Sequence, residues 1–444
     1  MATKILNGDC RDVLRTLPAD SVHCVVTSPP YWGLRDYGVP PSIWGGDDDC
    51  DHQWGDEIAV NATNHTDKAR WNHTRNGRDE EQPPEKRVSW LRTKVKQGSY
   101  CQRCCAWAGA HGLEPNYSLY VENEVRIFAE VRRVLRPDGT LWLNLGDSYA
   151  TGAGKVGDRP GGGAQGDAWG GHRGSRGGSE KQPHTGSAIG PMTQPNRMPQ
   201  LGLKPKDLCG IPWRVAFALQ ADGWWLRQDI IWSKPNPMPE SVTDRCTKAH
   251  EYLFLMSKSE RYRYDAAAIA EPLGLASLAR LNQNIDQQRG SDRVPGKTNG
   301  TMKAVGRRAA GNKTHKGTTA YEAGDERLRT KAGLVAFAER EREKVDAGDL
   351  EGSRNRRSVW TVPTQPFSEA HFATFPPDLV EPCIKAGSPE GGTVLDPFGG
   401  SGTVGLVADR LHRDAILIEL NPEYAAMAER RIKADGGMFA SVTA

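Results

Sequence analysis

Apolar positions near the start of the chain switch between strand spacing and helix spacing. Residues 5–6 and 23–26 are short apolar runs of the kind that form buried strands, and between them Val13, Leu14 and Leu17 recur at helical spacing. The pattern predicts a strand, a helix and a second strand.

The same alternation continues to the end of the chain. The predicted elements are a helix over 119–135, the strand TLWLNLGD, a helix over 211–221, strands over 225–232 and 252–256, and within 371–434 a helix, strand, helix, strand and helix. About seven buried strands are interleaved with helices, which predicts one doubly wound, mostly parallel α/β sheet.

Composition and charge bear on the cellular location and the possible partners more than on the function. A net charge of +3 over 444 residues leaves no polybasic tail, so any surface for nucleic acid must be local. Nine cysteines, no apolar N-terminal segment and no apolar stretch of membrane-spanning length indicate a cytoplasmic protein with no membrane partner and with reduced or metal-bound cysteines.

The segment TVLDPFGGSGTVGLVADR, residues 393–410, places a glycine-rich turn between a strand and a helix. Glycine lets the backbone approach a ligand there, and a helix N-terminus favours an electronegative group. No lysine follows, which excludes a P-loop. Glu419 ends the next strand, where nucleotide-binding folds hold ribose hydroxyls. The alternatives are a tight turn and a surface glutamate.

Two motifs then resemble one family. DPFGGSGT, residues 396–403, resembles the cofactor loop of S-adenosylmethionine-dependent DNA methyltransferases, and TSPPY, residues 27–31, resembles the catalytic loop of members that methylate exocyclic amino groups. Their order along the chain resembles the β-class. The resemblance implies a Rossmann-like methyltransferase fold, S-adenosylmethionine as cofactor, double-stranded DNA as partner, and a homodimer, as β-class relatives often form.

The resemblance also implies cofactor roles near the adenine, around the methionine part and in the segment packed over it. Asp9 would lie near the adenine, Phe398, Gly400 and Gly402 around the methionine part, and Phe375 and Pro376 in the segment packed over it. Asp396 and Glu419 complete the set of cofactor residues.

The catalytic turn suits transfer to an amino group. Ser28 Oγ and the Pro29 carbonyl can accept the two amino hydrogens, while Pro29 and Pro30 fix the backbone without offering an N–H. Tyr31 would stack on a base flipped out of the duplex, and Trp32 would wall the pocket. A plain turn with core aromatics is the alternative.

A cysteine and histidine set predicts a structural zinc site. Cys50 and His52 form Cys-x-His, and Cys101 and Cys104 form Cys-x-x-Cys, which are zinc ligand types; Cys105 is spare. The alternative is a set of reduced surface cysteines.

These features divide the chain into functional regions. We predict a catalytic part over 1–39 and 116–265 with a loop over 152–200, an insertion with a zinc knot over 40–115, a target-recognition region over 266–357, and a cofactor part over 358–444. Within 293–321 there is no acidic residue, and the basic side chains there are predicted to contact DNA phosphates. They are Arg293, Lys297, Lys303, Arg307, Arg308, Lys313 and Lys316. A solvated basic loop is the alternative.

The prediction is therefore a DNA methyltransferase that acts on adenine N6 or cytosine N4 of a flipped base. Ser28 resembles the residue of cytosine-N4 enzymes, whereas adenine-N6 enzymes more often have Asp or Asn, but a serine accepts an amino hydrogen from either base. The rival functions are a methyltransferase of the same fold acting on RNA or protein, and a catalytically inactive DNA-binding module.

Overall fold

The computed structural model describes residues 1–33, 39–63, 92–96, 98–150, 202–240, 242–274, 353–365, 375–437 and 441–443. The chain forms two compact units, one made of Met1–Tyr264 with Ser358–Ala444 and the other of Asp265–Arg357. In the second unit, β11 (Glu271–Pro272) pairs antiparallel with β12 (Ser353–Arg354).

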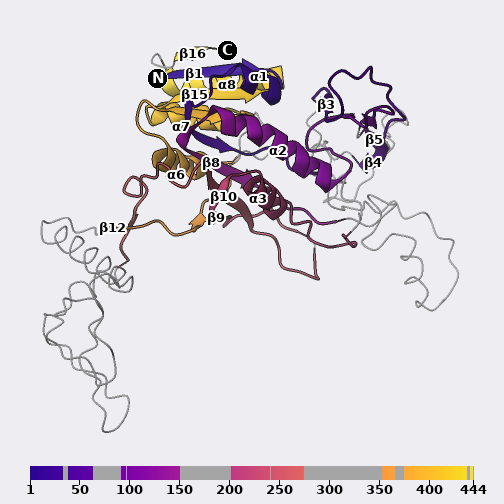
Figure 1. Ribbon diagram of the computed structural model, residues 1–444. Helices are drawn as coiled ribbons and strands as arrows, with labels where there is room; N and C mark the ends of the chain where they lie inside the picture. Colours follow the sequence, from indigo (N-terminus) through magenta and orange to yellow (C-terminus); the bar gives the residue numbers. More distant parts are fainter. Residues whose placement is uncertain are drawn as a thin grey trace, which may run out of the picture. The chain divides into compact units, whose positions relative to one another are not determined.

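The first unit is built on a nine-stranded sheet with the order β13-β9-β10-β8-β2-β14-β15-β1-β16 (Figure 1). Its strands are β1 (Ala2–Asn7), β2 (Val22–Thr27), β8 (Leu135–Leu145), β9 (Trp225–Ser233), β10 (His250–Ser257), β13 (Val359–Thr361), β14 (Thr393–Asp396), β15 (Asp414–Glu419) and β16 (Ser441–Thr443). Strand β10 runs antiparallel to β8 and β9, and the other neighbours are parallel. The mostly parallel sheet is confirmed. Two edge strands of three residues each, β13 and β16, extend the seven predicted ones.

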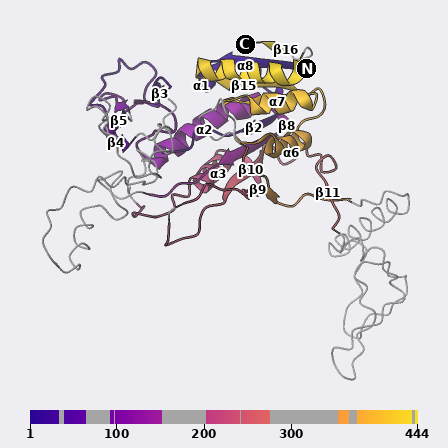
Figure 2. The same ribbon diagram turned by 180° about the vertical axis from the view of Figure 1, so that it is seen from behind.

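Helices cover both faces of this sheet (Figures 1 and 2). On one face α2 (Tyr117–Val134) packs between α1 (Cys10–Thr16) and α3 (Ile211–Ala221), and on the other α7 (Thr403–Arg410) packs between α6 (Pro377–Gly387) and α8 (Pro422–Gly436). No helix in the described ranges is long and apolar enough to cross a membrane.

Side-chain caps and apolar faces explain where these helices form. Asn116 Oδ1 accepts from the Leu119 N–H at the start of α2, and Ile127, Phe128 and Val131 place its apolar face in the core.

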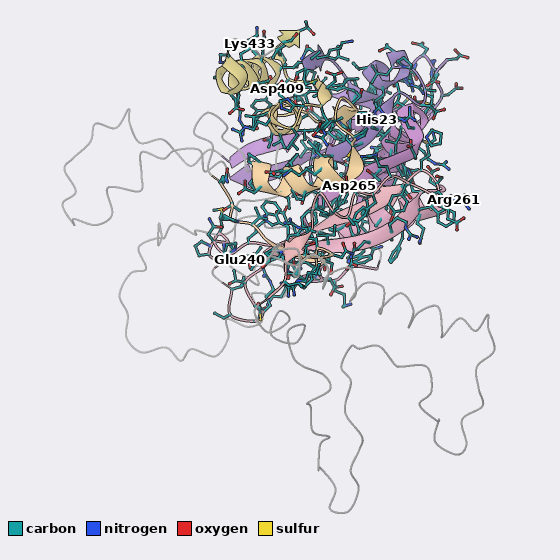
Figure 3. The ribbon with its side chains drawn as sticks, turned by 90° about the vertical axis from the view of Figure 1, so that its left-hand side faces the viewer. His23, Glu240, Arg261, Asp265, Asp409 and Lys433 are labelled. Carbon is teal, nitrogen blue, oxygen red and sulfur yellow. The ribbon has the colours of Figure 1, made fainter. Side chains whose placement is uncertain are left out.

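Figure 3 shows Lys433 of α8 at one end of the sheet and Glu240, which follows β9, at the other.

The order of the strands reverses between β2 and β14. From β14 the chain passes to β15 on one side, and from β2 it passes to β8 on the other. Because the two central strands are parallel neighbours, the loops that follow them meet at the same edge of the sheet. Such a switch point is where open α/β sheets bind ligands.

The insertion after the catalytic turn contains short strands that its polar sequence did not predict. Strands β3 (Ser42–Trp44), β7 (Trp107–Gly109) and β6 (Ser99–Tyr100) form a small antiparallel sheet, and β4 (Ala59–Thr63) pairs with β5 (Arg92–Lys96).

Candidate functional site

A cavity of about 940 Å³ lies at the carboxyl edge of the central strands. Residues 28–31 line it from the catalytic turn, and residues 397–401 line it from the glycine-rich turn. Residues 8–10 and Glu419 add further walls. The two predicted motifs, far apart in the sequence, therefore share one cavity of a size that suits a nucleotide-like ligand.

Asp396 holds the glycine-rich turn from behind the cavity wall. Its Oδ1 accepts from Thr27 Oγ1 at 2.7 Å and from the Phe398 N–H at 3.0 Å, and the residue is 1% exposed. Burial raises the pKa of this carboxyl to about 7, although both hydrogen bonds act to lower it. Asp396 is not among the residues that line the cavity.

Glu419 lines the cavity and also braces the turn. Its Oε2 accepts from the Gly400 N–H at 2.7 Å and its Oε1 from the Asn421 N–H at 2.8 Å. Burial raises the pKa of the carboxyl. A carboxylate has about four acceptor sites, so Glu419 keeps capacity for a ligand hydroxyl.

The other predicted cofactor residues divide into two groups. Phe375, Phe398 and Gly400 line the cavity, whereas Pro376 and Gly402 lie behind it. Pro376 precedes the first turn of α6. Gly402 has a φ of +77° and packs against α8, where an added Cβ would lie 2.8 Å from the Ala428 Cβ.

Asp9 also lines the cavity, with its carboxylate engaged by the protein. It caps α1 through the Arg11 N–H, pairs with the Arg11 guanidinium at 2.6 Å, and accepts from Ser42 Oγ at 2.9 Å. Burial would raise the pKa of Asp9, but the contacts with Arg11 outweigh it and lower the pKa.

The catalytic turn presents all four predicted residues to the cavity. Ser28 Oγ donates to the Tyr31 hydroxyl at 3.3 Å, and Tyr31 donates to Glu251 Oε2 at 2.8 Å. The Pro30 carbonyl accepts from the Tyr120 hydroxyl at 3.0 Å. The turn is therefore fixed from both sides.

Trp32 does not line the cavity, so the predicted wall is wrong at this position. The side chain is 1% exposed in the core, and its indole N–H donates to the Glu114 carbonyl at 3.0 Å. The turn after Tyr31 directs Trp32 inward.

Three polar residues at the cavity were not predicted from the sequence. Asn144 is the second-last residue of β8, Glu251 is the second residue of β10, and Lys234 follows β9. Asn144 Nδ2 donates to Glu251 Oε2 at 3.0 Å and also contacts the Tyr31 hydroxyl, and Lys234 Nζ pairs with Glu251 Oε1. Burial would raise the pKa of Glu251, but the Lys234 ammonium and the hydrogen bonds outweigh it and lower the pKa.

His111 is a further cavity residue that the sequence did not indicate. Its Nδ1 lies 2.8 Å from Glu114 Oε1, and its Nε2 lies 2.9 Å from Glu124 Oε1. Burial would lower the pKa of His111, but the two carboxylates outweigh it and raise the pKa to about 10. The imidazolium stacks on Phe398 with the ring centroids 5.9 Å apart.

The insertion brings the predicted metal ligands together. One ligand atom from each of Cys50, His52, Cys101 and Cys104 lies within 4.8 Å of the others. Cys105, the spare cysteine beside Cys104, is exposed. The basic residues predicted to contact DNA, from Arg293 to Lys316, lie outside the described residues.

A doubly wound sheet with these two turns at its switch point defines an α/β protein that binds a nucleotide-like ligand at this edge. Comparison with known proteins agrees, because the family model described as DNA methylase matches residues 22–430. The chain belongs to this DNA methylase family. It is an S-adenosylmethionine-dependent DNA amino-methyltransferase.

The chain is also similar to individual proteins. The chain is 36% identical over 429 residues to the type II methyltransferase M.XycI of Xanthomonas campestris pv. cyanopsidis, covering 97% of this chain and 87% of that protein. It is 35% identical to the type II methyltransferase M.Cfr9I of Citrobacter freundii, covering 97% and 88%. Among solved structures, the cytosine-N4-specific PvuII DNA methyltransferase aligns with 15% identity and a TM-score of 0.45, covering 97% of this chain and 87% of that one.

Proposed function

We propose that the chain methylates the exocyclic amino group of an adenine or cytosine that has been flipped out of duplex DNA into the cavity beside Ser28 and Tyr31. The observation that carries the proposal is the shared cavity, in which the catalytic turn and the glycine-rich turn face the same space. The methyl donor and the acceptor must approach each other closely there for direct transfer.

Ser28 and Pro29 would orient the amino group. Ser28 Oγ donates its proton to the Tyr31 hydroxyl and accepts from Asn144 Nδ2 at 3.5 Å, so one of its two lone pairs is left for the amino group. No donor in the described residues reaches the Pro29 carbonyl. Two acceptors at the cavity match the two hydrogens of an amino group. With both hydrogens held, the nitrogen lone pair would attack the methyl carbon, the carbon–sulfur bond of the sulfonium would break as the C–N bond forms, and the surplus amino proton would pass to solvent.

Tyr31 would stack on the flipped base. Its hydroxyl is anchored by Glu251, and an added Cβ at Gly146 would lie 2.5 Å from the Tyr31 ring, so glycine leaves room for that ring. A rigid aromatic face beside the acceptors suits a base of either kind.

The cofactor would occupy the opposite part of the cavity. We assign the ribose hydroxyls to Glu419, the methionine part to Phe398 and Gly400, and the adenine to the wall around Asp9 and Phe375. Pro376, Asp396 and Gly402 would support this wall from behind.

Four broader assignments belong to the proposal. The type II description of M.XycI and M.Cfr9I supports a role in a restriction-modification system. The nine cysteines, which all lie in the described residues, form no disulfide with one another, and this supports a cytosolic location. A homodimer, and DNA phosphate contacts from the basic run of residues 293–316, complete the proposal.

Expression in a bacterium that lacks DNA methylases tests the function in cells. Genomic DNA digested to nucleosides should contain either N6-methyladenine or N4-methylcytosine by mass spectrometry. The Ser28→Ala variant, expressed at the same level, should yield little of it. Absence of both methylated nucleosides with the native chain would refute the proposal.

A further inference from the structure

We propose that Cys50, His52, Cys101 and Cys104 bind one zinc ion, and that this ion holds in place the wall of the cofactor cavity formed by β3. The metal would be structural, because all four ligand positions come from the protein. The coupling to the cavity rests on the proposed cofactor site, whereas the zinc site itself does not.

The distances between the four side chains fit a metal better than a disulfide. Cys50 Sγ lies 3.9 Å from Cys101 Sγ, and Cys104 Sγ lies 3.3 Å from His52 Nδ1. Tetrahedral zinc with bonds of about 2.3 Å to sulfur separates two sulfurs by about 3.8 Å. A disulfide would need about 2.05 Å.

The backbone turns the two later sulfurs toward the same point. The Cys101 N–H donates to the Ala106 carbonyl at 2.8 Å, and the Cys105 N–H donates to the Cys101 carbonyl at 3.0 Å. Cys105 has a φ of +60°, a left-handed conformation that closes the turn and leaves this side chain exposed. The Arg103 N–H also points at Cys101 Sγ, at 3.4 Å. This loop is folded around its thiols.

A metal cross-link would stabilise the insertion beyond the core packing of Trp44 and Trp107. Its antiparallel sheet consists of strands of two or three residues, and short hairpins of this kind are marginal without extra packing or a metal. Zinc binding by a small motif contributes directly to its folding free energy.

Strand β3 links the ligand cluster to the cofactor cavity. Gly46, just beyond its end, lies so close to the cluster that an added Cβ would be 2.8 Å from Cys104 Sγ. At the other side, Ser42 and Trp44 line the cavity. Loss of the ion would therefore loosen β3, which lies between the ligand cluster and the cofactor cavity.

Contacts with the start of α1 connect β3 to residues of the cofactor cavity. Arg11 Nη1 donates to the Ile43 carbonyl at 2.6 Å, and its guanidinium lies 3.8 Å above the Trp44 ring. Ser42 donates to Asp9, which also lines the cavity. A displaced β3 would therefore disturb the residues proposed to face the cofactor adenine.

The experiment uses the full chain and compares Cys104→Ser with Cys105→Ser. Cys105 is the matched control, because it is the adjacent cysteine and its thiol is exposed. We expect one zinc per chain by plasma mass spectrometry in the native protein and in Cys105→Ser, and loss of zinc in Cys104→Ser. Calorimetric titration with S-adenosylmethionine should show affinity weakened by about tenfold or more in Cys104→Ser only, because ordering the loosened wall then opposes binding.

Cobalt substitution keeps the test valid if Cys104→Ser does not fold. The native chain refolded with Co²⁺ should show the thiolate charge-transfer and tetrahedral d–d bands, and chelation of the metal should weaken cofactor binding to the same extent. Native protein without metal, zinc retained by Cys104→Ser, or a disulfide in its place would overturn the zinc site. Metal loss with unchanged cofactor affinity would overturn the coupling. A native, zinc-loaded chain that binds no S-adenosylmethionine would instead contradict the proposed cofactor site.

Discussion

Thr27 Oγ1 donates a hydrogen bond of 2.7 Å to Asp396 Oδ1, and this bond joins the ends of two neighbouring parallel strands. Each residue immediately precedes one of the two functional turns, and each is 1% exposed. The bond therefore fixes the catalytic turn and the glycine-rich turn relative to each other.

We predict that Thr27→Val destabilises the protein and slows turnover. Valine keeps the shape but removes the hydroxyl donor, so the buried Asp396 carboxyl retains the Phe398 N–H and loses the bond from residue 27, which costs about 1–3 kcal/mol of unfolding free energy. Urea unfolding and methylation rates measure the two effects. Thr361→Val, at an exposed position of β13, is the control and should change neither. Equal effects at both positions would contradict the account.

For Tyr31, we predict that replacement by alanine reduces turnover far more than it affects the cofactor. Loss of base stacking worth about 1–3 kcal/mol corresponds to roughly 5- to 150-fold in rate. The Kd for S-adenosylmethionine should stay within a few-fold. Tyr31→Phe keeps the ring and loses only the hydrogen bond to Glu251, so its defect should be smaller. Alanine and phenylalanine variants with the same rate would rule out stacking.

Lys234→Met is predicted to expose the cost of an unpaired carboxylate at the cavity. Glu251 is deeply placed and would lose its ammonium partner, so the pKa of Glu251 should rise and the free energy of unfolding should fall by about 2 kcal/mol near neutral pH. Lys433→Met removes a surface pair with Glu429 and should cost under about 1 kcal/mol. Denaturant titrations of the two variants measure both free energies of unfolding. A Lys433→Met variant less stable than Lys234→Met would contradict the prediction.

His111 gives a prediction for pH dependence. Its pKa is raised to about 10, so the protonated form stabilises the fold. This contribution is complete below about pH 6.5, the pKa of an unfolded histidine, and is lost as the pH rises toward 10. In His111→Gln the group no longer titrates, so the decline of unfolding free energy between about pH 7 and 10 should be shallower than in the native chain. Parallel curves for the two proteins would show that this proton has no role.

The sequence predicted the central architecture because each strand carried its own signal. Apolar runs marked β2 and β14, and the proline and glycine turns after them marked the cavity edge. The edge strands β13 and β16 are too short to show a strand period.

Residues brought in by tertiary structure were harder to predict. Glu251 reaches the cavity because β10 runs antiparallel and begins at that edge, which no local pattern reveals. Asn144 did leave a signal, since it is a polar residue at the end of an otherwise apolar run. His111 lies in the aperiodic insertion, and its role depends on Glu124 of α2.

Transfer of a labelled methyl group to DNA tests the proposed amino-methyltransferase activity. Purified protein is incubated with S-adenosylmethionine that carries a labelled methyl group and with unmethylated bacterial genomic DNA, and the DNA is digested to nucleosides and resolved by chromatography. We predict that the label appears on one nucleoside, either N6-methyldeoxyadenosine or N4-methyldeoxycytidine. The Ser28→Ala variant should bind the cofactor normally and transfer little of the label. Label on a ring carbon, on RNA or protein added in parallel, or on no nucleoside at all would contradict the account.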